Sequence, residues 1–153
     1  ILSDIAASIQ EKMEKNHIAT TDVQGIGVGV PAAVLGEGYV KKVANLGWEN
    51  KDVKQELEAL TGIKVKVAND ANVAALGEMW KGGGEGYKSL VMVTLGTGVG
   101  GGIIIDGKIY SGFNYAGAEL GHIVIEKGGN LLITFLFSYG SKVGILVSCL
   151  GLT

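Results

Sequence analysis

Apolar residues recur along this chain with two different spacings, and stretches of the two kinds alternate. Leu2, Ile5, Ile9 and Met13 recur at helical spacing, which predicts a helix over residues 1–16 with one buried face. The same spacing predicts helices over 52–62 and 73–80, the first beginning at an aspartate and ending at a glycine. Short apolar runs predict strands at 23–30, 39–43, 63–68, 90–95 and 103–105. Alternating strands and helices are typical of an α/β fold.

A glycine-rich segment, residues 96–102, separates two of these predicted strands. A turn without Cβ atoms lets backbone N–H groups converge on an anion, and Thr97 adds a hydroxyl donor. The spacing of Gly96, Gly98 and Gly101 also fits a dinucleotide-binding fingerprint, but that motif needs a helix after the glycines. Here a strand follows, and Asp106-Gly107 then indicates a hairpin turn. The segment is therefore predicted to be a phosphate-binding β-hairpin, with a glycine-rich turn that binds no ligand as the alternative.

The run LGTGVGGGIIIDGKIYSGFNYAGAELGH, which begins at Leu95, resembles the nucleotide- and sugar-binding core of bacterial glucokinases of the ROK family (repressors, uncharacterised frames and sugar kinases). The resemblance covers residues 1–130 and implies the α/β, actin-like ATPase fold, also called ribonuclease H-like. Nothing before Ile1 supplies the D-x-G-G-T phosphate loop of that fold, so the implied fold is incomplete. It implies a partial N-terminal lobe at 1–81 and the start of a C-terminal lobe at 82–130, followed by an anomalous apolar tail at 131–153.

The sequence Asn69-Asp70-Ala71-Asn72 follows the predicted strand 63–68. In the resembled family this place holds the catalytic aspartate. Asp70 is therefore the candidate general base, a carboxylate that accepts the proton of a sugar hydroxyl as the bond to phosphorus forms. The residues alone leave a second role open, because an aspartate between a strand and a helix commonly caps the helix.

Further sugar contacts follow from the resemblance. It implies that Asn69 hydrogen-bonds sugar hydroxyls, and that Asn45 belongs to a sugar pocket formed by the loop at Pro31 and the stretch N-L-G-W. The loop reads P-A-A-V where family members commonly show P-G-P-V. Trp48 is either a stacking platform for a sugar or a core aromatic residue, and without the resemblance the core role is favoured.

Glu119 and His122 are three positions apart, so on a helical turn or in a tight loop they point the same way. A carboxylate beside an imidazole can bind two vicinal hydroxyls of a pyranose. The resemblance implies that the glutamate contacts sugar, and that the histidine contacts sugar and also ligates zinc. The family's C-x-C-G-x-x-G-C zinc segment has no cysteine in register here, so no bound zinc is predicted. The alternative is a surface glutamate and a core histidine.

The composition limits which binding partners and which cellular compartment are expected. A net charge of −2 gives no reason to expect nucleic acid or an anionic membrane, and without arginine any phosphate must be held by backbone amides, lysine or metal. The single cysteine, Cys149, and the absence of a visible secretory signal favour the cytoplasm. The apolar runs of the tail, 131–137 and 143–152, are each too short to cross a bilayer.

Together these inferences predict an ATP-dependent glucokinase of glycolysis that phosphorylates the C6 hydroxyl of glucose. ATP and Mg²⁺ are the predicted cofactors, and the predicted phosphate-binding residues are Gly96, Thr97, Gly98, Gly100 and Gly101. The family implies a homodimer. The alternatives are a transcriptional repressor that senses sugar, or a kinase for fructose, mannose, allose or an N-acetylated amino sugar. The 153-residue chain by itself is expected to be inactive, because phosphoryl transfer in this fold needs two closing lobes.

Overall fold

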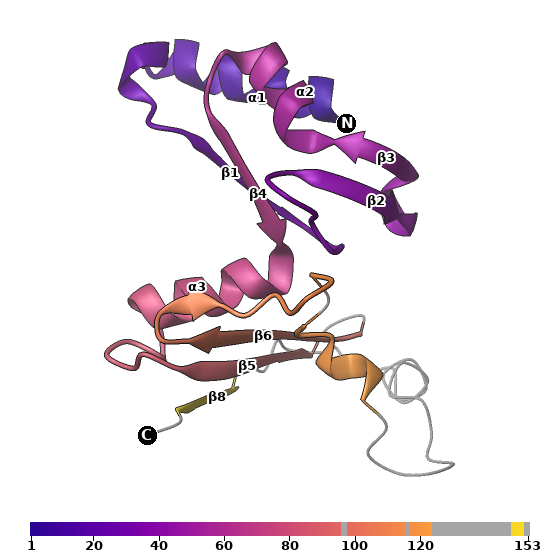
Figure 1. The fold of residues 1–153 in the computed structure, drawn as a ribbon. Coiled ribbons are helices and arrows are strands. Elements are labelled where there is room, and N and C mark those ends of the chain that lie inside the picture. Colours follow the sequence, from indigo (N-terminus) through magenta and orange to yellow (C-terminus); the bar gives the residue numbers. More distant parts are fainter. Residues whose placement is uncertain (96–97, 116, 124–147, 152–153) are drawn as a thin grey trace, which may run out of the picture. The chain divides into compact units, whose positions relative to one another are not determined.

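The computed structural model of the chain describes residues 1–95, 98–115, 117–123 and 148–151. The chain divides into two compact units, which we name the first unit, Ile1–Asp70, and the second unit, Ala71–Thr153 (Figure 1). The elements of both units mix helices and strands, as the sequence predicts.

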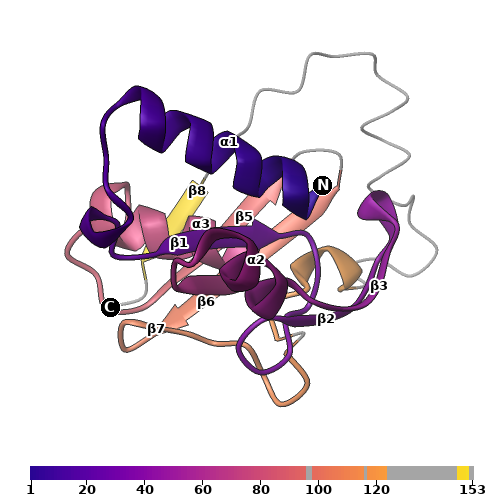
Figure 2. The same cartoon turned by 90° about the horizontal axis from the view of Figure 1, so that it is seen from above.

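The first unit combines two helices with two small sheets. Strands β1 (Ile26–Val30) and β4 (Val65–Asn69) pair in parallel, and β2 (Tyr39–Val43) pairs with β3 (Trp48–Asp52) as an antiparallel hairpin (Figure 1 and Figure 2). The helices are α1 (Leu2–Lys15) and α2 (Val53–Thr61), which contact each other. Two short 3₁₀ turns, η1 (Thr20–Asp22) and η2 (Ala44–Leu46), complete the unit.

Helix α2 begins and ends where the sequence predicts. The Asp52 carboxylate accepts a hydrogen bond from the backbone N–H of Gln55 at 2.9 Å, which caps the first turn. Gly62 ends the helix in the left-handed region, with φ of 70°, which a residue without Cβ adopts at little cost.

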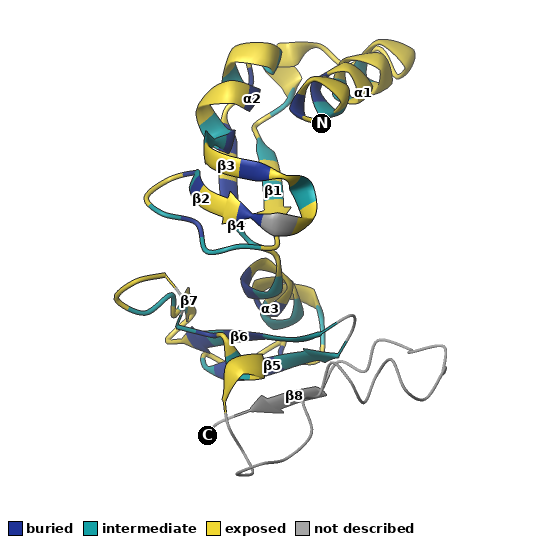
Figure 3. Cartoon of the chain, turned by 90° about the vertical axis from the view of Figure 1, so that its right-hand side faces the viewer, coloured by how far each residue is buried: buried dark blue, intermediate teal, exposed yellow. Residues whose placement is uncertain are grey.

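The core of the first unit draws on every one of its helices and strands. Val40, Val53 and Leu57 are completely buried, and α1 contributes Leu2 and Ala6. Figure 3 shows that most of the rest of α1 is exposed, so this helix buries a single stripe, as its apolar spacing predicts.

Strand β3 is not predicted by the apolar pattern. Its sequence, WENKD, has one apolar residue, Trp48, and the charged positions after it are exposed or half-buried. Pairing with β2 places Trp48 opposite Val43 and Asp52 opposite Tyr39. The hairpin therefore forms through its buried end and its backbone, which an alternation of apolar and polar residues does not reveal.

The second unit places one helix against an antiparallel sheet. Helix α3 (Asp70–Lys81), which begins at the last residue of the first unit, lies along β5 (Leu90–Leu95) and β6 (Val99–Ile105) (Figure 1). Strand β7 (Lys108–Ile109) pairs with β6, and β8 (Ser148–Gly151) pairs with β5. The predicted turn between β6 and β7 is confirmed, because Asp106 and Gly107 both have positive φ, 49° and 76°.

The two compact units divide after Asp70, whereas the sequence suggests a lobe boundary after residue 81. Ala75 is completely buried with Leu90, Met92 and Ile104, and Met79 packs against this cluster. These contacts join α3 to the second unit. The roles assigned to 1–81, 82–130 and 131–153 remain predictions.

The glycine-rich segment is mostly strand and only partly turn. Strand β6 begins at Val99, which pairs with Leu95, so Gly100, Gly101 and Gly102 lie inside the strand. The predicted turn over 96–102 is therefore too long. Because these glycines carry no side chain, neighbouring elements pack directly on the backbone of the strand, as described below.

Of the C-terminal tail, the described part is β8, which pairs antiparallel with β5 from Leu90 opposite Gly151 onward. The apolar run 131–137 lies outside the described residues. Among the helices of the described ranges, none combines the length and the hydropathy that crossing a bilayer requires.

Candidate functional site

The first set of candidate residues lies at the carboxyl edge of the parallel pair β1 and β4 in the first unit. Val30, the last residue of β1, pairs with Asn69, the last residue of β4. The loop beginning at Pro31 and the aspartate Asp70 therefore leave the two strands at the same edge. In α/β sheets this edge is where ligands bind, because the loops that follow parallel strands converge there.

A hydrogen bond ties the two chain segments together at this edge. The side-chain amide of Asn69 donates from Nδ2 to the carbonyl oxygen of Ala32 at 3.3 Å. Asp70 is exposed and is the first residue of α3. The structure thus places Asp70 at the sheet edge, and its roles as general base and as helix cap both remain predictions.

Asn45 lies in η2, the turn that joins β2 to β3, and its side chain is exposed. Leu46 and Trp48 pack into the core cluster that also contains Ala32 and Val34 of the proline loop. Trp48 is 9% exposed, which identifies it as the core aromatic residue of the two alternatives. Core packing thus fixes both segments that the resemblance assigns to a sugar pocket.

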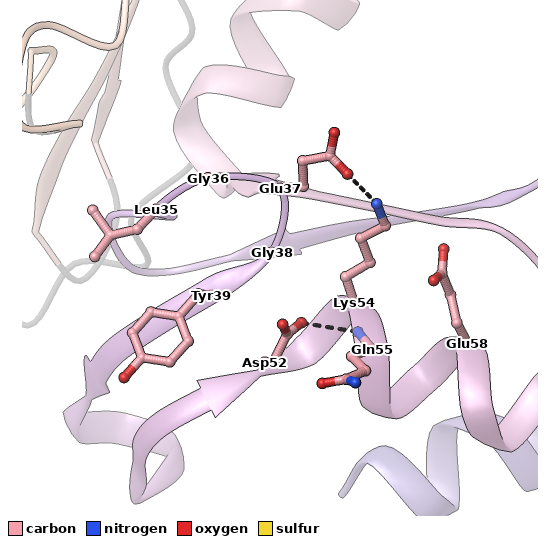
Figure 4. Close-up of a pocket in the computed structure, with 9 residues that line it drawn as sticks. All are labelled: Leu35, Gly36, Glu37, Gly38, Tyr39, Asp52, Lys54, Gln55 and Glu58. Carbon is pink, nitrogen blue, oxygen red and sulfur yellow. Dashed lines mark hydrogen bonds and ion pairs between the residues drawn. The ribbon is translucent and has the colours of Figure 1, made fainter.

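A surface pocket lies between the end of the proline loop and the start of α2 (Figure 4). Glu37 points toward Lys54 and forms an ion pair and hydrogen bond with its ammonium group, while Asp52 faces Gln55 in the α2 cap. The hydrogen bond from Lys54, and then its charge, lower the pKa of the Glu37 carboxyl. This pair fastens the proline loop to α2.

Removing the ammonium group of Lys54 should return the pKa of Glu37 toward its ordinary value of 4.5. Because the carboxylate has a lowered pKa in the folded chain, the stabilisation from the pair is complete above the unfolded pKa and is lost as the pH falls through the folded one. A ¹³C NMR titration of the Glu37 carboxyl in the chain and in Lys54→Met measures this change. Lys51→Met, which breaks the neighbouring 2.7 Å pair with Glu56, is the matched control. An unchanged Glu37 titration in Lys54→Met would refute the pairing.

A second set of candidate residues lies in the second unit, between β5 and β6. Of the predicted phosphate-binding residues, Gly96 and Thr97 lie outside the described residues. Gly98 is half-buried, and among the described residues a Cβ added there would meet no atom within 4 Å. The described part of the chain therefore leaves space for a ligand to approach the backbone at Gly98.

Gly100 and Gly101 are closely packed, and their predicted binding of phosphate remains a prediction. A Cβ at Gly100 would lie 2.5 Å from the Thr94 hydroxyl oxygen, and one at Gly101 would lie 2.5 Å from Cδ1 of Leu120. A Cβ at Gly102 would lie 2.5 Å from that of Ala75 in α3. Because successive residues of a strand face opposite sides, β6 presents bare backbone to α3 on one face and to Leu120 on the other.

Glu119 and His122 lie close together, as their spacing predicts. The 3₁₀ turn η3 (Leu120–His122) brings Nδ1 of His122 within 3.5 Å of Oε2 of Glu119. The imidazole is 83% exposed, so it is not a core histidine. Among the described residues no group of three or more histidine, cysteine, aspartate or glutamate side chains could hold a metal, and the sugar role of the pair remains a prediction.

Sequence reasoning missed the role of Leu120, one of the two residues between Glu119 and His122. Leu120 packs on Gly101, and Gly121 lies against Val99. The signal for this contact is weak, because a single leucine in a loop has no periodicity that would mark it as buried.

Comparison with known proteins now gives the family. The sequence pattern of the ROK family matches residues 2–137, so the chain belongs to the ROK family. Its structure is similar to that of a ROK family glucokinase from Streptomyces griseus in complex with glucose and AMPPNP, with a TM-score of 0.65 and 36% sequence identity. This similarity covers 80% of this chain and 39% of that one. The chain therefore has the α/β, actin-like ATPase fold, in part.

Relatives with different activities resemble the chain. A glucokinase of Halalkalibacterium halodurans is 44% identical over 131 residues, which are 84% of this chain and 40% of the relative. A xylose repressor of Caldicellulosiruptor bescii is 34% identical over 119 residues, 77% of this chain and 30% of the relative. The chain thus spans less than half the length of these relatives.

Proposed function

We propose that this chain forms part of an ATP-dependent sugar kinase that phosphorylates glucose to glucose 6-phosphate. The observation that carries the proposal is the position of Asp70, directly after β4 and at the same sheet edge as the loop after β1. A carboxylate there can accept a proton from a sugar hydroxyl held by the two loops. The 44% identity to a glucokinase supports glucose as the sugar.

The other polar residues have complementary roles in this proposal. Asn45, Asn69, Glu119 and His122 each contact sugar hydroxyls in this proposal. Backbone N–H groups of Gly96, Thr97, Gly98, Gly100 and Gly101 bind the phosphates of ATP in this proposal. Mg²⁺ enters with ATP and is held mainly by phosphate oxygens and water, where it neutralises phosphate charge.

A sugar-responsive repressor is the second candidate, and the 34% identity to a xylose repressor favours it. A repressor needs the sugar contacts but not the proton transfer. The kinase is the stronger proposal because Asp70 is present at the sheet edge, where a sensor has no use for a general base.

A chimaera separates the two candidates. In it, this sequence replaces the segment that it matches in the Halalkalibacterium halodurans glucokinase. ADP production is measured with glucose, fructose, mannose, allose, N-acetylmannosamine and xylose in turn. The proposal expects the highest kcat/KM with glucose. A chimaera that binds glucose by calorimetry yet produces no ADP would favour the sensor, and a higher kcat/KM with another sugar would overturn the choice of glucose.

A further inference from the structure

The segment 118–122 is seated on the first residues of β6. A Cβ at Gly101 would lie 2.5 Å from Cγ and Cδ1 of Leu120 and 2.8 Å from the carbonyl oxygen of Ala118. Ala118 is 7% exposed. Leu120 therefore rests directly on bare backbone, at a position where any side chain on the strand would push it away.

A second contact supports the first. A Cβ at Gly121 would lie 3.0 Å from that of Val99, so the backbone after Leu120 also lies against the strand. Backbone hydrogen bonds from Leu120 to Ala118 at 2.8 Å and from His122 to Glu119 at 3.1 Å close the turn. The turn is thus fixed both by its own hydrogen bonds and by the strand beneath it.

The residues on either side of Leu120 differ from it in exposure. Leu120 is half-buried, whereas the Glu119 and His122 side chains are 48% and 83% exposed and lie 3.5 Å apart. Two exposed side chains lose conformational freedom when they are held in one geometry, and an exposed pair of this kind contributes little stability by itself. The geometry of the pair therefore depends on the backbone of the turn, and that backbone depends on Leu120.

We propose that Leu120 is a positioning residue, which holds Glu119 and His122 in the geometry that binds the sugar by anchoring their turn on Gly101 of β6. This inference rests on the proposed function for the binding of sugar, but not for the geometry of the pair. Leu120 touches neither substrate, and acts through the backbone on the two residues that do. Because Val99 and Gly101 directly follow the phosphate loop, the same contact ties the sugar-binding pair to the phosphate-binding strand.

The first test measures the geometry without any activity. In the 153-residue chain, the NOE between the His122 imidazole and the side chain of Glu119 is expected to be present. Leu120→Ala should abolish it, and Leu120→Met should keep it. The matched control is Ile109→Ala, which removes a similar volume from the same unit, where Ile109 packs on the cluster of Leu90 and Ile104. An NOE that survives in Leu120→Ala would overturn the proposal.

The second test measures the consequence for the sugar, in the chimaera. Leu120→Ala should raise the KM for glucose about tenfold while the KM for ATP changes less than twofold, because a small misplacement of binding groups acts on the sugar alone. Ile109→Ala should leave both constants near those of the parent, and Leu120→Met should restore the KM for glucose. Equal effects of Leu120→Ala and Ile109→Ala on both constants would overturn the positioning role. A parent chimaera without turnover would instead contradict the proposed function, while the NOE still decides the geometry.

Discussion

Asp70→Asn in the chimaera is expected to lower kcat by a factor on the order of 10²–10⁴, the usual contribution of general acid–base catalysis. The amide preserves the size of the side chain and its hydrogen-bonding oxygen, but it cannot accept the proton of the sugar hydroxyl. Glucose binding should therefore remain within twofold of the parent, as measured by calorimetry. A loss of kcat without a loss of binding marks an interaction made only in the transition state.

Asp52→Asn is the matched control for this substitution. Asp52 also stands at the start of a helix, where its carboxylate accepts a hydrogen bond from Gln55. Asparagine caps a helix about as well as aspartate, so this variant should keep both the fold and the turnover. A kcat for Asp70→Asn within tenfold of the parent would refute the assignment, because removal of a general base lowers kcat by more than that.

Sequence reasoning located most of the helices and strands because their cores have simple periodicity. The apolar spacing of Leu2, Ile5, Ile9 and Met13 predicts α1, and Asp52 and Gly62 mark the ends of α2. Strand β3 was not predicted, because its pairing depends on the backbone and on one buried residue, Trp48. Patterns of side chains carry no information about a strand that is held by its backbone.

The glycines of β6 show a second reason why the sequence alone could not predict the whole fold. Five glycines in the segment 96–102 indicate a turn when the sequence is taken by itself. The structure accounts for two of them by partners that come from other parts of the chain, Ala75 for Gly102 and Leu120 for Gly101. Glycine is required there by close approach and not by turn geometry, and close approach is visible only when the partners are in place.

For the candidate site, the sequence identified residues by their local motifs but did not show which residues come together in space. Motifs identified Asp70, Glu119 and His122, and the spacing of the last two predicted their contact. The hydrogen bond from Asn69 to Ala32 joins residues that are distant in the sequence, and only the pairing of β1 with β4 brings them together. The chemistry of the residues is thus local information, whereas their assembly depends on the register of the strands.

A second large effect is expected from substituting the glycines, because one substitution should weaken ATP binding while another should destabilise the fold. In the described part of the chain no atom lies within 4 Å of a Cβ added at Gly98, and the φ of Gly98 lies outside the left-handed region, so Gly98→Val should leave the fold intact. The new side chain covers backbone N–H groups that are proposed to bind ATP. Losing one hydrogen bond to a charged group costs about 1.5–3 kcal/mol, so the KM for ATP should rise about tenfold to hundredfold. The KM for glucose should change much less.

Gly102→Ala provides the contrast, because here the added Cβ meets Ala75 at 2.5 Å and the Ala71 carbonyl oxygen at 2.8 Å. Overpacking of this kind costs roughly 1–3 kcal/mol, so this variant should unfold at lower denaturant concentration than either the parent or Gly98→Val. Denaturation curves and Michaelis constants measured on the same preparations distinguish the two effects. If Gly98→Val lost as much stability as Gly102→Ala, or raised both Michaelis constants equally, the loop at Gly98 would be a structural turn and not a phosphate site.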